Sequence, residues 1–485
     1  MKKIEIDNKQ AILIICILLG AFIRLYALDR QSFWFDELYS VMSASEQTFK
    51  GLFNNWIIHD VHPPLYQVLL FYWAKVFGSS EFAIRALSAI AGILAVIFMY
   101  VFSKDLFDEN VRINSTIILC FSSSAMYFSQ EARSYSILLM FSVVSTIIWL
   151  KLLKNIDNSD INKSDFIIYA ISAILVSYTH YFGFILILYQ LVYLIICSFV
   201  SKKSIKKNIL LSSIILISVS IWVGFHFLTE LQSKLSGNYW IEKPTLMFFV
   251  MYFGFVLNPL TLSIPLLIIV PAIVKYKDFF ANLKESAKFS LNSPFYALIY
   301  LAFFPLISLF IVSMQTPILI NKFLIILFPA YYLLIAYWIS QNNFFKDYKG
   351  ILYVIIVSFI MLNVSLRSYY NVLFKQNWRQ AIEFIVSNDN ENIETFSSGE
   401  TTNKYSKYYL DMFNEKYNKK VILDNIKNKS LDSIFKNNKN KIVLVLNTKY
   451  DMLDKNYFEK LKKLSKNFEF KEFHPEVSVI IFYLK

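Results

Sequence analysis

The stretch AILIICILLGAFIRLYAL, at residues 11–28, decides the fold class of this chain. It is long enough to cross a hydrocarbon core of about 30 Å as one helix, and similar apolar blocks recur as far as about Arg367. Of the 485 residues, 56% are hydrophobic and 17% are charged. A soluble chain carries roughly 25% charged residues, so the sequence predicts an all-α, multi-pass membrane protein.

The apolar blocks predict about eleven membrane-spanning helices. They fall at about 11–28, 83–103, 113–128, 135–153, 166–199 (two helices that turn at 178–183), 209–228, 246–275 (broken at Asn258-Pro259), 295–313, 323–340 and 351–367. Lysines ahead of the first block place the N-terminus in the cytoplasm, and this span count then places the C-terminus outside. No A-x-A-like site follows the first block, so it is expected to be a retained helix in the cell membrane.

The chain changes character after residue 367, where it becomes polar and rich in lysine. We therefore predict a transmembrane domain at 1–367 and a small soluble α/β domain at 368–485, on the extracytoplasmic side. Residues 442–446 and 477–483 have the β-branched content of strands, and 378–386 and 457–464 have helical apolar spacing.

The net charge of +13 does not indicate a nucleic-acid partner in this chain. Its lysines lie largely in short loops between apolar blocks, where they set the membrane topology. Cys16, Cys120 and Cys197 all lie inside apolar segments, so neither a disulfide nor a zinc site is expected.

The loop at 29–81 carries the most unusual chemistry of the chain, beginning with SFWFDELY at residues 32–39. Asp36 and Glu37 are adjacent carboxylates, and Trp34 and Phe35 are aromatic residues of the kind found at the level of the lipid headgroups. An alternative is that the two acids only stabilise the N-terminus of the next helix.

A second motif, HDVHPPLY at residues 59–66, precedes a predicted amphipathic helix at the membrane surface. His59, Asp60 and His62 would lie at the N-terminal end of that helix. The His-x-x-His spacing could suggest a metal, but no third ligand is evident, so we predict no metal site. We expect these side chains to hydrogen-bond substrate or to orient Asp36.

Three cations are predicted to lie at one depth, on the same side as Asp36. These are Arg85 near the end of the second span, Arg133 in the next outer turn and Lys322 at the start of a late span. A cation inside a membrane is costly and usually faces a partner or a wet cavity, although snorkelling to the interface is the alternative for each. The predicted substrate-binding set is completed by Glu131, Tyr135, His180 and Tyr181, which lie in outer turns.

A carboxylate and several cations at the outer leaflet fit the chemistry of a sugar linked to a lipid phosphate. The phosphate leaves as an anion, which cations stabilise, while the attacking hydroxyl needs a base. The chain has no Gly-x-x-x-x-Gly-Lys phosphate loop, which agrees with an activated donor rather than ATP.

The motifs together resemble the GT-C glycosyltransferases. The resemblance covers about residues 11–385 and rests on Phe35-Asp36-Glu37, His62-Pro-Pro-Leu-Tyr66, Arg85-Ala-Leu-Ser-Ala89, Gln130-Glu-Ala-Arg-Ser-Tyr135, Thr179-His-Tyr-Phe182 and Trp378-Arg-Gln-Ala381. Within the superfamily, the chain is most similar to the branch of protein O-mannosyltransferases, lipid A aminoarabinose transferases and rhizobial lipopolysaccharide galacturonosyltransferases.

The resemblance implies an inverting transfer from a polyprenyl-phosphate sugar to a hydroxyl of a glycan, lipid or protein. It implies that Asp36 is the base, that Glu37 supports it or contacts the acceptor, and that Arg85, Arg133 and Lys322 bind the donor phosphate. Many relatives have arginine in place of Lys322, which lacks the planar fork of arginine. No cofactor is required, although some relatives use a divalent cation.

Two other functions remain as alternatives at this point. A flippase or transporter for lipid-linked saccharides also needs cations in a membrane cavity, but internal repeats typical of transporters are not evident. An O-antigen ligase or polymerase also uses lipid carriers, but such enzymes place their chemistry in a late loop, whereas the acids here follow the first span.

Overall fold

The computed structural model describes most of the chain and divides it into two compact units. The described residues are 8–156, 162–226, 241–257, 290–341, 373–388, 395–428, 441–447, 455–473 and 476–484. The membrane unit comprises Met1–Tyr26, Glu46–Gly78 and Ala83–Arg367, and the C-terminal unit comprises Ala27–Ser45, Ser79–Phe82 and Ser368–Lys485.

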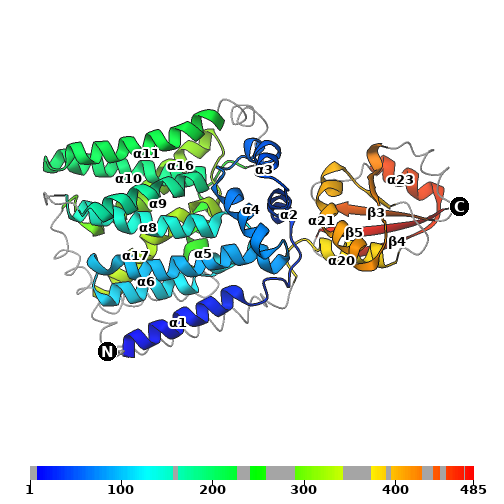
Figure 1. Ribbon diagram of the computed structural model, residues 1–485, viewed down its shortest axis with the longest axis horizontal. Helices are drawn as coiled ribbons and strands as arrows, with labels where there is room; N and C mark the ends of the chain where they lie inside the picture. The colour runs from blue at the N-terminus through cyan, green and yellow to red at the C-terminus, as the bar shows by residue number, and fades with distance from the viewer. Residues whose placement is uncertain are drawn as a thin grey trace. The chain divides into compact units, whose positions relative to one another are not determined.

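The membrane unit is built from helices that lie side by side (Figure 1). The long helices are α1 (Asn8–Leu25), α5 (Glu81–Phe102), α8 (Tyr135–Lys154), α9 (Lys163–Thr179), α10 (Tyr181–Ser201), α11 (Ile205–His226), α16 (Pro294–Gln315) and α17 (Phe328–Gln341). Shorter elements are α3 (Phe49–Asn55), η1 (Ile57–His59), α4 (Leu65–Phe77), η2 (Ser103–Asp105), α6 (Glu109–Phe121), α7 (Ser123–Ser129), α13 (Met247–Leu257) and η5 (Asn321–Leu327).

Seven of the described helical segments are long and apolar enough to cross a membrane. The prediction of a mostly helical, multi-pass membrane protein is therefore confirmed. The predicted span at 351–367 and the Asn258-Pro259 break lie outside the described residues, so the count of eleven stays a prediction. Helix α4 follows Pro64 as predicted.

One predicted span, 113–128, is interrupted in the structure. Helix α6 ends at Phe121 and α7 begins at Ser123, because Ser122 adopts an extended conformation and its Oγ accepts a hydrogen bond from the Ala125 N–H at 3.3 Å. A serine that caps a helix in this way satisfies one of the free amides at its start. The apolar run alone did not reveal this break.

The predicted turn at 178–183 is confirmed, and it falls on a single residue. Helix α9 ends at Thr179 and α10 begins at Tyr181, with His180 in an extended conformation between them. The N–H of Phe182 donates to His180 Nδ1 at 3.1 Å, so the imidazole caps α10. This contact fixes the direction of the His180 ring.

Helix α8 forms the core of the membrane unit, since nearly all of its residues are buried. The indole of Trp149 on α8 donates to the carbonyl of Gln190 on α10 at 2.8 Å. Elsewhere in this unit, a Cβ added at Gly92 would collide with Ser129 Oγ, so α5 and α7 approach closely there. Small residues allow such close approach of membrane helices.

The C-terminal unit contains a five-stranded mixed sheet. Its strands are β1 (Thr395–Ser397), β2 (Leu423–Asn425), β3 (Lys441–Asn447), β4 (Ser465–Phe473) and β5 (Val477–Leu484), in the order β2-β1-β3-β5-β4. Strand β1 is parallel to both β2 and β3, whereas β5 is antiparallel to both β3 and β4. The helices are α2 (Phe35–Ala44), α20 (Trp378–Ser387), α21 (Glu400–Tyr417) and α23 (Lys455–Leu464), and a short η6 (Ile426–Asn428) follows β2.

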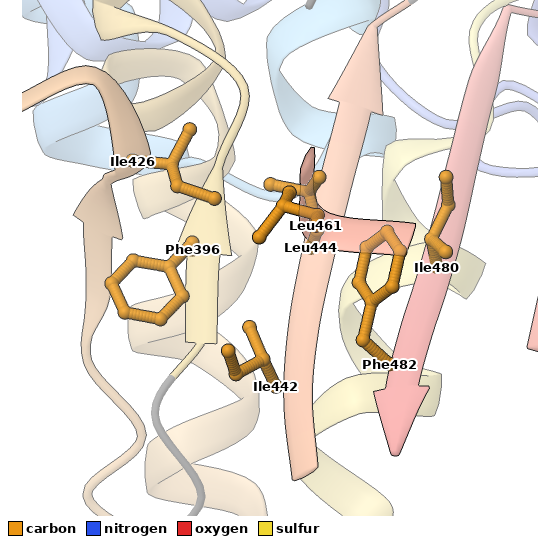
Figure 2. Close-up of a cluster of buried hydrophobic side chains, with 7 residues drawn as sticks. All are labelled: Phe396, Ile426, Ile442, Leu444, Leu461, Ile480 and Phe482. Atoms are coloured by element: carbon orange, nitrogen blue, oxygen red, sulfur yellow. The ribbon is translucent and has the colours of Figure 1, made fainter. Parts of the chain in front are cut away.

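The predicted strands and helices of this unit are confirmed, and alternation of apolar residues explains its core. Ile442 and Leu444 of β3 share one face with Ile480 and Phe482 of β5, and Leu461 of α23 completes the cluster from a helix (Figure 2). Strand residues two apart point to the same face, so these pairs bury one side of the sheet.

The C-terminal unit also includes two segments from the first long loop, 27–45 and 79–82. Helix α2, which carries Asp36 and Glu37, therefore packs with residues more than 300 positions later in the chain. The predicted boundary at residue 367 instead assigns the whole loop to the transmembrane domain.

Candidate active site

His180 is the centre of a buried polar cluster in the membrane unit. Its ring lies 5.1 Å from the His62 ring and 4.8 Å from the Phe323 ring, measured between centroids. The side chain is almost fully buried at 3% exposure. Since Nδ1 accepts the Phe182 N–H, the proton of the neutral ring is on Nε2.

The HDVHPPLY motif brings Asp60 and His62 together at the start of α4. Asp60 Oδ1 accepts from His62 Nδ1 at 2.9 Å and from the His62 backbone N–H at 3.0 Å. Gln67, in the first turn of α4, donates from Nε2 to the other Asp60 oxygen. Gln67 was not predicted as a site residue, because a glutamine inside an apolar helix gives no signal until its partner is known.

The charges of this cluster shift two titrating groups. Burial acts to raise the pKa of the Asp60 carboxyl, but His62 and Arg133 outweigh it and hold that pKa below its usual value. Burial, together with the positive charges of His62, Arg133 and Lys322, holds the pKa of His180 well below its usual range. Asp60 is therefore ionised at neutral pH, and His180 is neutral.

Arg133 and Lys322 are two permanent cations near this cluster. Lys322 Nζ lies 5.4 Å from the centre of the Tyr135 ring and 5.9 Å from that of Phe323. The carbonyl of Arg133 accepts a hydrogen bond from Ser88 Oγ at 3.2 Å. Ser88 is one turn beyond Arg85 on α5, which places the buried Arg85 near the same region.

The structure thus brings together, within one unit, most of the predicted substrate-binding residues. Glu131 is buried and its carbonyl accepts from the Arg133 N–H at 2.8 Å, so it lies in the same turn. His59, in contrast, is exposed at the end of η1. The roles of these residues in binding remain predictions.

Tyr181 has a partner that the sequence analysis did not identify. Its hydroxyl is hydrogen-bonded to Nδ1 of the fully buried His226, the last residue of α11, and the two rings are stacked with an interplanar angle of 11°. Trp222 also stacks on His226, with the ring centroids 5.5 Å apart. A lone histidine at the end of an apolar span gave no reason to pair it with the turn at 178–183.

The arrangement around His180 is suited to an anionic ligand. Among the described residues, no acceptor meets the buried Nε2 of His180. A neutral N–H donor held beside two permanent cations would be matched by an oxyanion, and leaving such a donor unmatched costs about 1–3 kcal/mol.

Asp36 and Glu37 lie in the C-terminal unit, in the first turn of α2. Asp36 is half-buried, whereas Glu37 is completely buried and accepts a hydrogen bond from Lys375 Nζ at 3.0 Å. Lys375 was not among the predicted residues, since only the fold brings it to Glu37. The meeting of Asp36 with the cations of the membrane unit remains a prediction.

Within the part of the chain that the structure describes, no three His, Cys, Asp or Glu side chains gather in a way that could hold a metal ion. Cys16, Cys120 and Cys197 are free thiols.

The whole-chain fold matches that of ArnT from Cupriavidus metallidurans. The chain is similar to ArnT bound to undecaprenyl phosphate with a TM-score of 0.60 and 12% identity, over 97% of each chain. Against the apo state the TM-score is 0.58 and the identity 10%, over 98% of each chain. At this level of identity the match shows that the chain has the fold of ArnT, and it shows nothing further.

Part of the chain also matches a protein family. Residues 61–223 match the model described as dolichyl-phosphate-mannose-protein mannosyltransferase. No curated protein matches the chain. The predicted resemblance is confirmed, and over residues 61–223 the chain is similar to a family of glycosyltransferases that use a lipid-phosphate-linked sugar donor. These matches favour the transferase over the transporter and ligase alternatives.

Proposed function

We propose that the protein transfers a sugar from a polyprenyl-phosphate carrier to a hydroxyl acceptor at the outer face of the cell membrane. The observation that carries this proposal is the cationic, donor-rich cluster around His180, in a fold that matches ArnT bound to undecaprenyl phosphate. The N-terminus is then cytoplasmic and the C-terminal unit extracytoplasmic.

In this proposal the cluster binds the donor phosphate. Arg133 and Lys322 neutralise the charge that develops on the leaving phosphate, and His180 Nε2 donates a hydrogen bond to one of its oxygens. Arg85 is proposed to reach the same phosphate. Because the phosphate leaves as a stable anion, no general acid is required.

Asp36 is proposed as the general base that removes the proton from the acceptor hydroxyl. Its half-exposed position at the start of α2 supports this role, since a base must reach its substrate, whereas its neighbour Glu37 is fully buried. Attack on the face opposite the phosphate would invert the anomeric configuration. No metal takes part in this scheme, although a divalent cation at the phosphate would be compatible with it.

The test is the variant Asp36→Asn, which is nearly isosteric. Transfer, measured by mass analysis of envelope glycans in a deletion strain that carries the variant, is expected to fall by about 10²–10⁴-fold. Binding of undecaprenyl phosphate to the purified variant should be unchanged. Asp411→Asn, at an exposed position on α21 in the same unit, is the matched control. If Asp36→Asn transfers sugar at the wild-type rate, Asp36 is not the general base.

A further inference from the structure

A network of hydrogen bonds within the C-terminal unit holds the loop segment that carries Asp36. We call this network the loop clamp, and it consists of Gln31, Glu37, Lys375, Gln376 and Arg379. Its members come from segment 27–45 and from the residues just before and within α20. The motif Trp378-Arg-Gln-Ala381 contributes to it and has no role in the proposed function.

The first part of the loop clamp joins backbone to side chain. Gln31 Oε1 accepts from the N–H groups of both Phe374 and Lys375, each at 3.1 Å. In return, the N–H of Phe35, the first residue of α2, donates to Gln376 Oε1 at 2.9 Å. Each segment thus satisfies backbone donors of the other.

The second part of the loop clamp is Arg379, which hydrogen-bonds to the loop segment that precedes α2. Its Nη1 donates to the Asp29 carbonyl at 2.8 Å and to Glu81 Oε2 at 2.6 Å, and Nη2 donates to the Arg30 carbonyl at 2.7 Å. A guanidinium holds several acceptors in one fixed plane, which a lysine does not.

The third part is the buried ion pair between Lys375 and Glu37. The two side chains are 5% and 0% exposed. Glu37 also accepts from the Trp34 N–H at 3.4 Å through its second oxygen. A buried ion pair is a weak source of stability but is strongly disrupted when one partner is removed, so it favours one arrangement of its neighbours over others.

We infer that Lys375 and Arg379 are positioning residues for Asp36, and that the C-terminal unit is part of the catalytic apparatus through the loop clamp. Asp36 adjoins Glu37, so a fixed Glu37 fixes the start of α2 and the backbone from which the Asp36 carboxylate extends. Glu37 is predicted either to support Asp36 or to contact the acceptor. Its burial and its pairing with Lys375 favour the first of these roles. This inference rests on the proposed role of Asp36 as base.

The decisive variant is Lys375→Met, which keeps the length of the side chain and removes its charge. Turnover per folded molecule is expected to fall by about 10- to 100-fold, because displacement of a catalytic group by about 1 Å costs on that order. The KM for the lipid-phosphate donor should stay within about twofold of the wild-type value, since the proposed donor site is the cluster around His180 and does not include Lys375.

The matched control is Lys416→Met. Lys416 also pairs with a glutamate of the C-terminal unit, Glu383, at 2.8 Å, but these side chains are 56% and 35% exposed, and among the described residues their pair lies on α20 and α21 rather than on segment 27–45. Its turnover should equal that of the wild type. The double variant Glu37→Gln/Lys375→Met, which leaves no unpaired buried charge, should recover most of the turnover lost in the single variant.

A second measurement covers the case in which Lys375→Met folds poorly. In Arg379→Lys, hydrogen exchange of residues 35–44 should rise while that of α8 is unchanged, and turnover should fall without a change in donor KM. Wild-type turnover per folded molecule in both Lys375→Met and Arg379→Lys would overturn the inference, as would an equal rise in donor KM.

The failure of this inference differs from the failure of the proposed function. If Asp36→Asn is inactive but Lys375→Met and Arg379→Lys turn over normally, only the positioning role is wrong. If Asp36→Asn is active, the assignment of Asp36 as the base is wrong, and the positioning role of Lys375 and Arg379 is then also rejected. In an Asp36→Asn background, Lys375→Met should cause no further loss of the residual transfer, since both act through one side chain.

Discussion

In the membrane unit, the Asp60–His62 pair lies beside a neutral histidine whose buried Nε2 meets no acceptor among the described residues. In the C-terminal unit, Glu37 and Glu81 each meet a cation, at 3.0 and 2.6 Å. The first cluster is therefore suited to receive a charged group from outside the chain. The charges in the C-terminal unit are paired with each other, so that cluster is suited to fix the local conformation of the chain.

The largest expected effect that tests this contrast comes from Lys322→Met. If Lys322 serves an incoming anion, its loss should weaken donor binding and turnover together by about 100-fold, the scale seen when one donor to a developing oxyanion is removed. Binding of undecaprenyl phosphate to the purified variant measures this directly. The matched control is Lys75→Met, since Lys75 also lies over an aromatic ring, at 5.1 Å from the centre of Phe71, but is exposed. Equal loss in the two variants would count against the contrast.

A smaller effect is expected in the C-terminal unit from Tyr409→Phe. The Tyr409 hydroxyl accepts from the Phe33 N–H at 2.7 Å and donates to Glu81 at 2.6 Å. Its removal leaves a buried donor unmatched, so the free energy of unfolding should fall by about 1–3 kcal/mol. Tyr417→Phe removes an exposed hydroxyl that donates to Glu383 at 2.9 Å and should change stability by less than about 0.5 kcal/mol. Thermal unfolding of the detergent-solubilised protein compares the two.

His180→Asn should affect binding more than stability. Asparagine can accept the Phe182 N–H as a helix cap, but it lacks the Nε2 donor. Donor affinity is expected to fall by about tenfold, the equivalent of one hydrogen bond to a charged group. His180→Phe, which also loses the cap, should in addition lose about 0.5–2 kcal/mol of stability. A stability loss in His180→Asn as large as that in His180→Phe would show that Nε2 has a structural partner.

The smallest expected effect is a pH dependence. Because the pKa of His180 is lowered in the folded state, the unfolded chain binds a proton below about pH 6.5 that the folded protein does not. Stability should therefore fall as the pH falls below that value, by at most about 1.4 kcal/mol per pH unit for this group. Melting temperatures between pH 7.5 and 5.5 should fall less steeply in His180→Asn than in the wild type. Parallel slopes would contradict a neutral, buried His180.

Local patterns were sufficient to predict much of this protein. Apolar length predicted α8 and α16, the polar turn predicted the break at His180, and β-branched runs predicted β3 and β5. Each of these signals is contained within about 20 consecutive residues. The residues of the HDVHPPLY motif were also found in this way, because they are adjacent in the chain.

Features that depend on distant partners were missed. Glu37 and Lys375 are 338 positions apart, and Tyr181 and His226 are 45 apart. Neither Lys375 nor His226 has a local pattern that separates it from an ordinary surface lysine or an end-of-helix histidine. The break at Ser122 was missed for a different reason, since a serine inside an apolar run is equally compatible with a continuous helix.

The separation of Glu37 from Lys375 has a consequence for biosynthesis. At roughly 5–20 residues per second, the ribosome finishes Lys375 about 20 to 70 seconds after Glu37 has been made. During that interval the nascent first loop has emerged without the residues that later enclose it. Until translation of the last quarter of the protein is under way, the segment with Asp36 and Glu37 lacks its partners. Either a chaperone or insertase shields this segment, or the chain tolerates its exposure.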